Sequence, residues 1–117
     1  MDEEQLRHRT KKFALRIIKL VGTLPKTVEG REIGRQLVRS GTSIGANYRG
    51  ACKGRSMAEF IAKLGIVEEE ADETAYWLEL IIEGGLLEKG AVDPLLRETN
   101  ELVAIMASSR KTASRRK

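Results

Sequence analysis

The chain has 117 residues, of which 41% are hydrophobic, 32% charged and 4% aromatic. This length suits one domain, and the composition is typical of an ordered, helix-rich protein. No apolar run approaches the roughly 20 residues that cross a bilayer. The N-terminal residues Met-Asp-Glu-Glu-Gln lack the basic and hydrophobic regions of a secretory signal, so we expect a cytoplasmic protein.

The net charge of +4 is unevenly distributed. Residues 1–55 carry 13 Lys/Arg and 5 Asp/Glu, residues 56–109 carry 3 and 12, and residues 110–117 carry 5 and none. These opposite charges can pair within one bundle, pair between subunits, or leave a basic surface for phosphates.

The first predicted helix covers about residues 3–22. Apolar and small residues recur there in steps of four and three, at Leu6, Thr10, Phe13, Ile17 and Leu20, which is the pattern of a helix packed along its neighbours. Its other side carries a basic stripe of Arg9, Lys12, Arg16 and Lys19. That stripe is either a solvated face or a surface that contacts phosphates.

The second predicted helix, about residues 31–50, is rich in glycine. Gly34, Val38, Gly41 and Gly45 share one face. Since glycine costs about 1 kcal/mol inside a helix relative to alanine, this face predicts close approach of another backbone. Small polar groups lie beside it at Ser40, Ser43 and Asn47, and they either pack tightly or line a small polar pocket. One edge is basic, with Arg31, Arg35 and Arg39.

The third predicted helix covers residues 57–83 and begins with the capping box Ser56-Met-Ala-Glu59. Its outer face is rich in carboxylates, but it contains no histidine. Carboxylate-bridged metal sites in helical bundles use Glu-x-x-His pairs, so we expect no metal. Trp77 lies one step off the buried face and is expected to anchor a core edge or an interface.

The fourth predicted helix covers about residues 94–109, because Asp93-Pro94 reads as an N-cap followed by proline at the first helical position. Residues 110–117 have no apolar side chain beyond one alanine. We expect them to form a flexible basic tail, which adds Arg110, Arg115, Arg116 and Lys117 to the basic surface.

Four amphipathic helices with short connections predict an all-α, antiparallel up-down-up-down four-helix bundle over residues 1–109. Apolar residues exceed what one small bundle needs, which favours a homo-oligomer. No set of residues specifies a reaction: Cys52 and His8 are the only cysteine and histidine, and nothing nearby in sequence activates the thiol. We therefore expect neither catalysis nor a cofactor.

Two signatures point to a family. Residues 36–48, Gln-Leu-Val-Arg-Ser-Gly-Thr-Ser-Ile-Gly-Ala-Asn-Tyr, precede residues 59–66 and 70–80, and together they resemble the four-helix-bundle proteins of the 23S rRNA intervening-sequence (S23) family. More remotely, the chain resembles the accessory variability determinant of diversity-generating retroelements. The resemblance implies a bacterial or archaeal cytoplasmic protein that forms a homopentameric ring and has a role involving nucleic acid. It implies no catalytic residues.

Two functions follow as hypotheses. The first is an oligomeric accessory protein that binds RNA or DNA without sequence specificity, through the basic residues of the first two helices and the tail. The second is a protein-interaction scaffold without nucleic-acid contact, in which Arg31, Arg35 and Arg39 meet Glu68, Glu69 and Glu73 of a neighbouring subunit.

Overall fold

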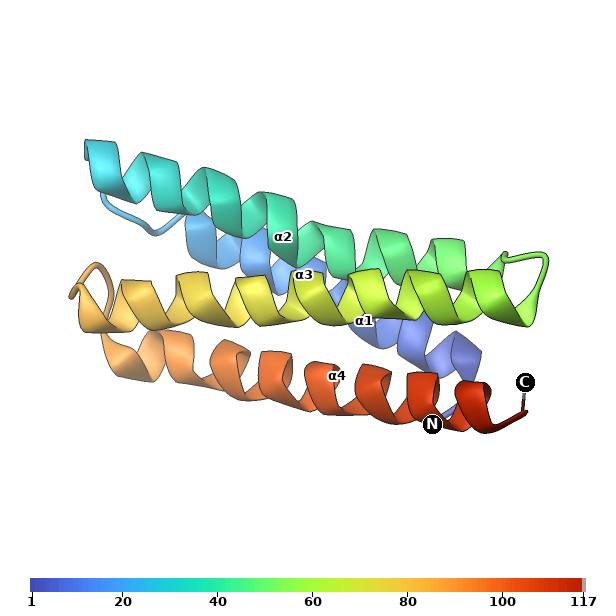
Figure 1. The fold of residues 1–117 in the computed structure, drawn as a ribbon. Coiled ribbons are helices and arrows are strands. Elements are labelled where there is room, and N and C mark those ends of the chain that lie inside the picture. The colour runs from blue at the N-terminus through green and yellow to red at the C-terminus, as the bar shows by residue number, and fades with distance from the viewer. Residues whose placement is uncertain (117) are drawn as a thin grey trace.

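The computed structural model describes residues 1–116, which form four α-helices and no strand. The helices are α1 (Glu3–Val21), α2 (Val28–Cys52), α3 (Met57–Glu83) and α4 (Lys89–Arg116). They run alternately in opposite directions and form an elongated bundle of 47 × 20 × 20 Å (Figure 1). Each helix packs beside the next, and α4 returns to α1. The predicted all-α fold is confirmed.

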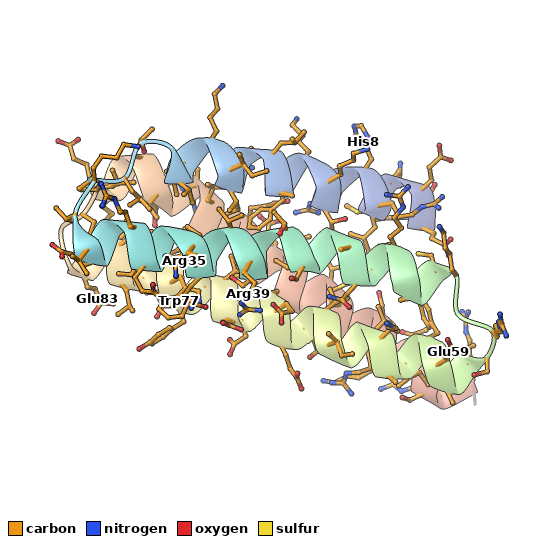
Figure 2. The ribbon with its side chains drawn as sticks, turned by 90° about the horizontal axis from the view of Figure 1, so that it is seen from above. His8, Arg35, Arg39, Glu59, Trp77 and Glu83 are labelled. Carbon is orange, nitrogen blue, oxygen red and sulfur yellow. The ribbon has the colours of Figure 1, made fainter. Side chains whose placement is uncertain are left out.

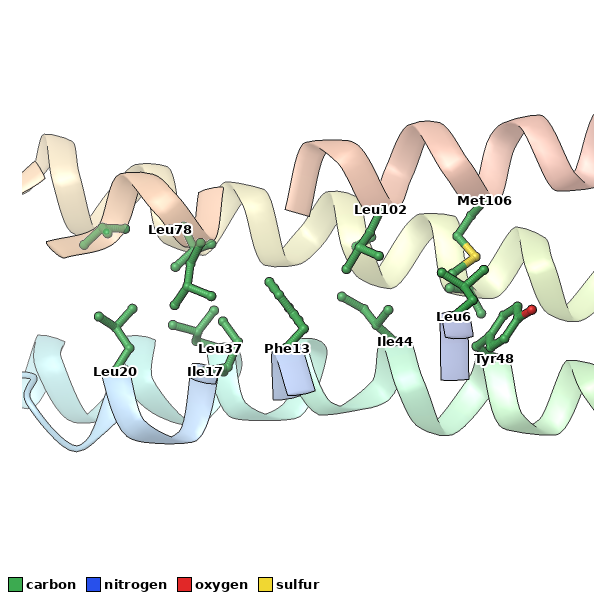
Figure 3. Close-up of a cluster of buried hydrophobic side chains, with 14 of the residues drawn as sticks. Leu6, Phe13, Ile17, Leu20, Leu37, Ile44, Tyr48, Leu78, Leu102 and Met106 are labelled. Carbon is green, nitrogen blue, oxygen red and sulfur yellow. The ribbon is translucent and has the colours of Figure 1, made fainter. Parts of the chain in front are cut away.

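The core follows the long axis of the bundle and receives side chains from all four helices (Figure 3). Its fully buried members include Phe13, Ile17, Leu37, Ile44, Leu64, Leu78, Leu102 and Met106. Each helix also buries one Ser or Thr residue: Thr10, Ser40, Thr74 and Thr99. The hydroxyls of these four residues donate to carbonyls of their own helices, so no side-chain polar atom buried within residues 1–116 lacks a partner.

The glycine-rich face of α2 lies against α1. A Cβ atom added at Gly41 would lie 2.9 Å from Cγ2 of Ile17, and one added at Gly45 would lie 3.3 Å from Oγ1 of Thr10. Both distances are shorter than ordinary van der Waals contacts. Glycine at these positions therefore sets the close packing of α1 on α2.

The start of α2 precedes its predicted position by three residues. The hydroxyl of Thr27 accepts a hydrogen bond from the Gly30 N–H at 3.1 Å and caps the helix. Gly30, which we assigned to the preceding connection, is buried in the first turn. A Cβ atom there would lie 2.1 Å from the Pro25 carbonyl oxygen, so this turn requires glycine.

The start of α4 differs from the prediction because Pro94 lies inside the helix, which begins at Lys89. Proline has no N–H to bond the carbonyl of Gly90, and because Gly90 is exposed, water can solvate that carbonyl. Val92 is fully buried. Its burial favours a helix that extends past the proline.

The predicted flexible tail is wrong for residues 110–116, because α4 continues to Arg116. Two contacts explain the extra turns. Arg110 forms an ion pair with Glu68 of α3, and Ala113 is buried beside Phe60 at the start of α3. Since α3 begins only at Met57, the last turns of α4 cover a surface that a shorter helix would leave exposed.

Candidate nucleic-acid interface

Three of the four helix interfaces carry an arginine–glutamate pair. Between α1 and α4, the Arg9 guanidinium donates to Glu98 at 2.6 and 2.7 Å, and this pairing raises the pKa of Arg9. Between α3 and α4, Arg110 pairs with Glu68, which likewise raises the pKa of the arginine. These charge-assisted pairs between helices neutralise arginines for which the sequence alone indicates no partner.

The α2–α3 pair involves Arg39. Its guanidinium lies 3.4 Å from Glu70 and also pairs with Glu73. Figure 2 shows Arg39 on α2 and Trp77 on the neighbouring α3. Glu73 accepts a further hydrogen bond from Nε1 of Trp77 at 3.3 Å. The hydrogen bond from Arg39, supported by that from Trp77, lowers the pKa of the Glu73 carboxyl group.

The α1–α2 interface is different. Among residues 1–116 no ion pair joins these two helices, although both carry exposed cations along their shared outer edge. The small residues that bring the helices together leave two hollows at this edge. We call the outer edge with its two hollows the α1–α2 groove.

The first hollow, which we call the Arg49 hollow, has a volume of about 440 Å³. Its floor is made of small residues: Ala14, Thr42, Gly45 and Ala46. Around it lie Glu4, Arg7, His8, Lys11 and Arg49. No described carboxylate forms an ion pair with Arg7, Lys11 or Arg49, so the hollow presents three cations and one carboxylate.

The second hollow, the Arg31 hollow, has a volume of about 400 Å³ and lies where α1 passes into α2. Its cations are Lys26, Arg31 and Arg35, and no acidic side chain lines it. The floor includes Gly30 and Gly34. Arg35 forms a pair with Glu32 at 3.3 Å, but both side chains are more than half exposed, so water screens that interaction.

The predicted nucleic-acid residues fall into three groups. Arg9, Arg39 and Arg110 are committed to the interhelical pairs. Arg31 and Arg35 line the Arg31 hollow. The residues of the third group are exposed and form no ion pair within residues 1–116: Lys12, Arg16, Lys19, Arg115 and Arg116. Lys117 lies outside the described residues. The contact of these side chains with nucleic acid stays a prediction.

The polar residues of the glycine-rich helix form no common pocket. The hydroxyl oxygens of Ser40 and of Thr74 on α3 lie 2.9 Å apart in the core, within hydrogen-bond distance. The Ser43 hydroxyl donates to the carbonyl of Arg39, and the Asn47 amide donates to the carbonyl of Ser43 at 2.9 Å. None of these three residues lines either hollow. Their contacts favour the structural alternative, in which these residues pack tightly and form hydrogen bonds with the nearby backbone.

Three further properties of the described residues bear on thiol catalysis, metal binding and membrane insertion. Within residues 1–116, burial raises the pKa of the Cys52 thiol, which disfavours the reactive thiolate. The same stretch contains no cluster of three or more His, Cys, Asp or Glu that could hold a metal ion. Among its helices, none combines the length and the hydropathy needed to cross a bilayer.

Sequence reasoning missed Arg7, Lys11 and Arg49, the three cations of the Arg49 hollow, and Lys26 of the Arg31 hollow. The stripe that contains Arg9 is the longer basic series on the first helix. Arg7 and Lys11 are four residues apart and share a face with Ala14. That smaller series, facing the glycines of α2, was the available signal.

Comparisons with known proteins show the family of this chain. The sequence profile described as "23S rRNA-intervening sequence protein" matches residues 3–108. A solved structure from Bacteroides thetaiotaomicron, described as a protein of unknown function from the S23 ribosomal protein family, is 35% identical and superposes with a TM-score of 0.85, covering 95% of this chain and 99% of that one. No functionally curated protein matches. The chain belongs to the 23S rRNA-intervening sequence protein family.

Proposed function

We propose that this protein is a non-catalytic accessory protein of the cytoplasm that binds RNA or DNA without sequence specificity through the α1–α2 groove. One observation carries the proposal. Arginine–glutamate pairs bridge the other three helix interfaces, whereas the α1–α2 interface gathers cations from both helices with one carboxylate among them. The two hollows therefore bring six Lys and Arg side chains together along one edge of the bundle.

Phosphate recognition suits this arrangement. Arginine presents planar N–H donors to phosphate oxygens, and lysine supplies a mobile point charge. Neutralising phosphates releases condensed counterions from the nucleic acid, and this release favours binding at low salt. Contacts to phosphates fix position but carry no direct sequence information, which explains why we propose non-specific binding.

The proposal is tested by fluorescence anisotropy with two labelled probes, a 12-nucleotide oligothymidylate and a 12-base-pair duplex. We expect binding at 50 mM salt that weakens linearly with log salt, with a slope of about −0.7 per contacted phosphate for the single strand and about −0.9 for the duplex. No binding of either probe at 50 mM salt, or an affinity that does not change with salt, would refute the proposal.

We also propose that the protein self-associates, because α3 exposes aromatic surface. Tyr76 is 54% exposed, and its ring contacts that of Trp77 edge-to-face at a centroid distance of 5.3 Å. Ile66, 39% exposed, lies on the same helix. Exposed apolar and aromatic side chains of this kind are typical of interfaces between subunits. The homopentameric ring that the family resemblance implies is part of this proposal.

Light scattering coupled to size exclusion tests self-association. We expect one discrete oligomer that persists in 1 M salt and dissociates in a Tyr76→Glu variant. The scaffold alternative predicts the reverse salt response, dissociation at high salt, and no nucleic-acid binding. Since Arg39 and Glu73 pair within one chain, as Glu68 does with Arg110, fewer charges remain for the contact between subunits that the scaffold requires.

A further inference from the structure

We infer that the α1–α2 groove holds one sugar–phosphate strand lengthwise, with backbone phosphates bound at both hollows. This inference rests on the proposed function and specifies how the nucleic acid lies. The Arg49 hollow and the Arg31 hollow are formed by the same two helices, so a single strand following the helix axes passes both.

The two hollows are in line because their residues continue the same helical stripes. On α2 the stripe contains Arg31, Val38, Thr42, Gly45 and Arg49, separated by seven, four, three and four residues. These steps keep side chains on one face of a helix. On α1, Arg7, Lys11, Ala14 and Val21 line the hollows in steps of four, three and seven.

The separation of the two charged ends sets the length of strand required. Arg35 and Arg49 are fourteen residues apart on one helix, which corresponds to about 21 Å at 1.5 Å per residue. Stacked nucleotides advance about 3.4 Å each along one strand. A strand of about six nucleotides therefore reaches from one hollow to the other.

The lining favours a sugar–phosphate backbone over bases. No Phe, Tyr or Trp side chain lines either hollow, and His8 is the one aromatic ring among the lining residues, so the groove offers little surface on which bases stack. Gly45 and Ala46 keep the floor low between the cations. Ile18 of α1 is 50% exposed and lies one turn beyond Ala14, where it offers apolar contact to sugars between the two charged ends.

Three charge-matched double variants test the inference. Arg7→Gln with Arg49→Gln alters the Arg49 hollow, and Arg31→Gln with Arg35→Gln alters the Arg31 hollow. The control, Lys12→Gln with Arg16→Gln, removes the same charge from α1 outside both hollows. All six side chains are exposed, so we expect each variant to fold, and circular dichroism checks this.

Anisotropy is measured with oligothymidylates of 3, 6 and 12 nucleotides and with a 12-base-pair duplex. The wild type should gain at least tenfold in affinity between 3 and 12 nucleotides, because the longer strand engages both hollows. Each groove variant should lose that gain, and its single-strand salt slope should fall by about 1.4, as expected for two lost phosphate contacts. The control should keep both the gain and the slope.

The possible negative results distinguish failure of the lengthwise binding mode from failure of the proposed function. If the wild type binds the 12-mer but the groove variants behave like the control, the lengthwise groove is wrong and non-specific binding stands. If the wild type binds no probe, the proposed function fails and the inference falls with it. Displacement of the 12-mer by polyglutamate at equal charge concentration would overturn the inference in favour of an acidic protein partner. The duplex shows whether the bound strand comes from single-stranded or paired nucleic acid.

Discussion

Gly41 and Gly65 show how differently two helical glycines contribute to this bundle. A Cβ atom at Gly41 would meet Cγ2 and Cγ1 of Ile17 at 2.9 and 3.0 Å, and Ile17 is fully buried. At Gly65 of α3, an added Cβ atom has no neighbour within 4 Å. Packing against Ile17 requires glycine at position 41, whereas glycine at position 65 only lowers the stability of its helix.

Alanine substitutions separate these roles. Gly41→Ala should destabilise the protein by about 1 kcal/mol, because overpacking costs about 1–3 kcal/mol and the gain in helix propensity returns at most about 1 kcal/mol. Gly65→Ala, the matched control, should stabilise it by about 0.5–1 kcal/mol. Urea unfolding measures both. Equal effects of the two changes would contradict the close packing of α1 on α2.

The Arg39–Glu73 pair should make stability depend on pH. Because the folded protein lowers the pKa of Glu73, the pair stabilises the fold above the unfolded carboxyl pKa of about 4.3. This contribution is lost as the pH falls through the lower folded pKa. Wild type should therefore be more stable than Arg39→Gln at pH 7, and the difference should shrink below about pH 4.

Urea unfolding from pH 3 to pH 7 checks that dependence. Arg35→Gln is the control, because its pair with Glu32 is exposed on the surface of α2. We expect that variant to show little change in stability across the range. A constant difference between wild type and Arg39→Gln at every pH would show that the pair does not act through the Glu73 carboxylate.

At the scale of the helices, the sequence predicts most of what the structure shows. The third helix is predicted at residues 57–83 with its start fixed by the Ser56 cap, and the structure agrees. The errors are at helix ends, where tertiary packing overrides local signals. Asp93-Pro94 is a strong start signal, but burial of Val92 extends α4 backwards past it to Lys89.

The end of α4 yields a prediction. A chain ending at Ser109 loses the Arg110–Glu68 pair and the buried Ala113, and it exposes Phe60. It should lose about 1–2 kcal/mol of stability and some helical circular dichroism. A chain ending at Ser114 keeps both contacts and lacks only the terminal charges, so it should match the full-length protein. Equal stability of the two truncated chains would support a flexible tail instead.

The candidate site was less predictable than the helices. Helical spacing shows which cations share a face, but it does not show which neighbouring helix that face meets. Arg9 belongs to the longest basic stripe, yet it faces Glu98 of α4. Arg7 lies two residues earlier and reaches the groove beside α2. Only the packing of the four helices distinguishes these two positions.

Across the whole molecule, the division of charge along the chain becomes a division in space. Glutamates of α4 and α3 neutralise arginines of α1 and α2 at the interfaces that they share. At the α1–α2 edge, six Lys and Arg side chains line the two hollows and Glu4 is the one carboxylate among the lining residues. Sequence-wide counts of Lys and Arg therefore overstate the basic surface, because Arg9, Arg39 and Arg110 are paired with glutamates.

The most direct test of nucleic-acid binding in the α1–α2 groove is an NMR titration of ¹⁵N-labelled protein with the 12-nucleotide oligothymidylate. The chain has 11 glycines, and their amides report on separate surfaces. We predict that Gly30, Gly34 and Gly45, which line the groove, shift on binding, while Gly65 and Gly90 on α3 and α4 do not. Shifts confined to Gly65 and Gly90, or no shifts at all, would contradict the account.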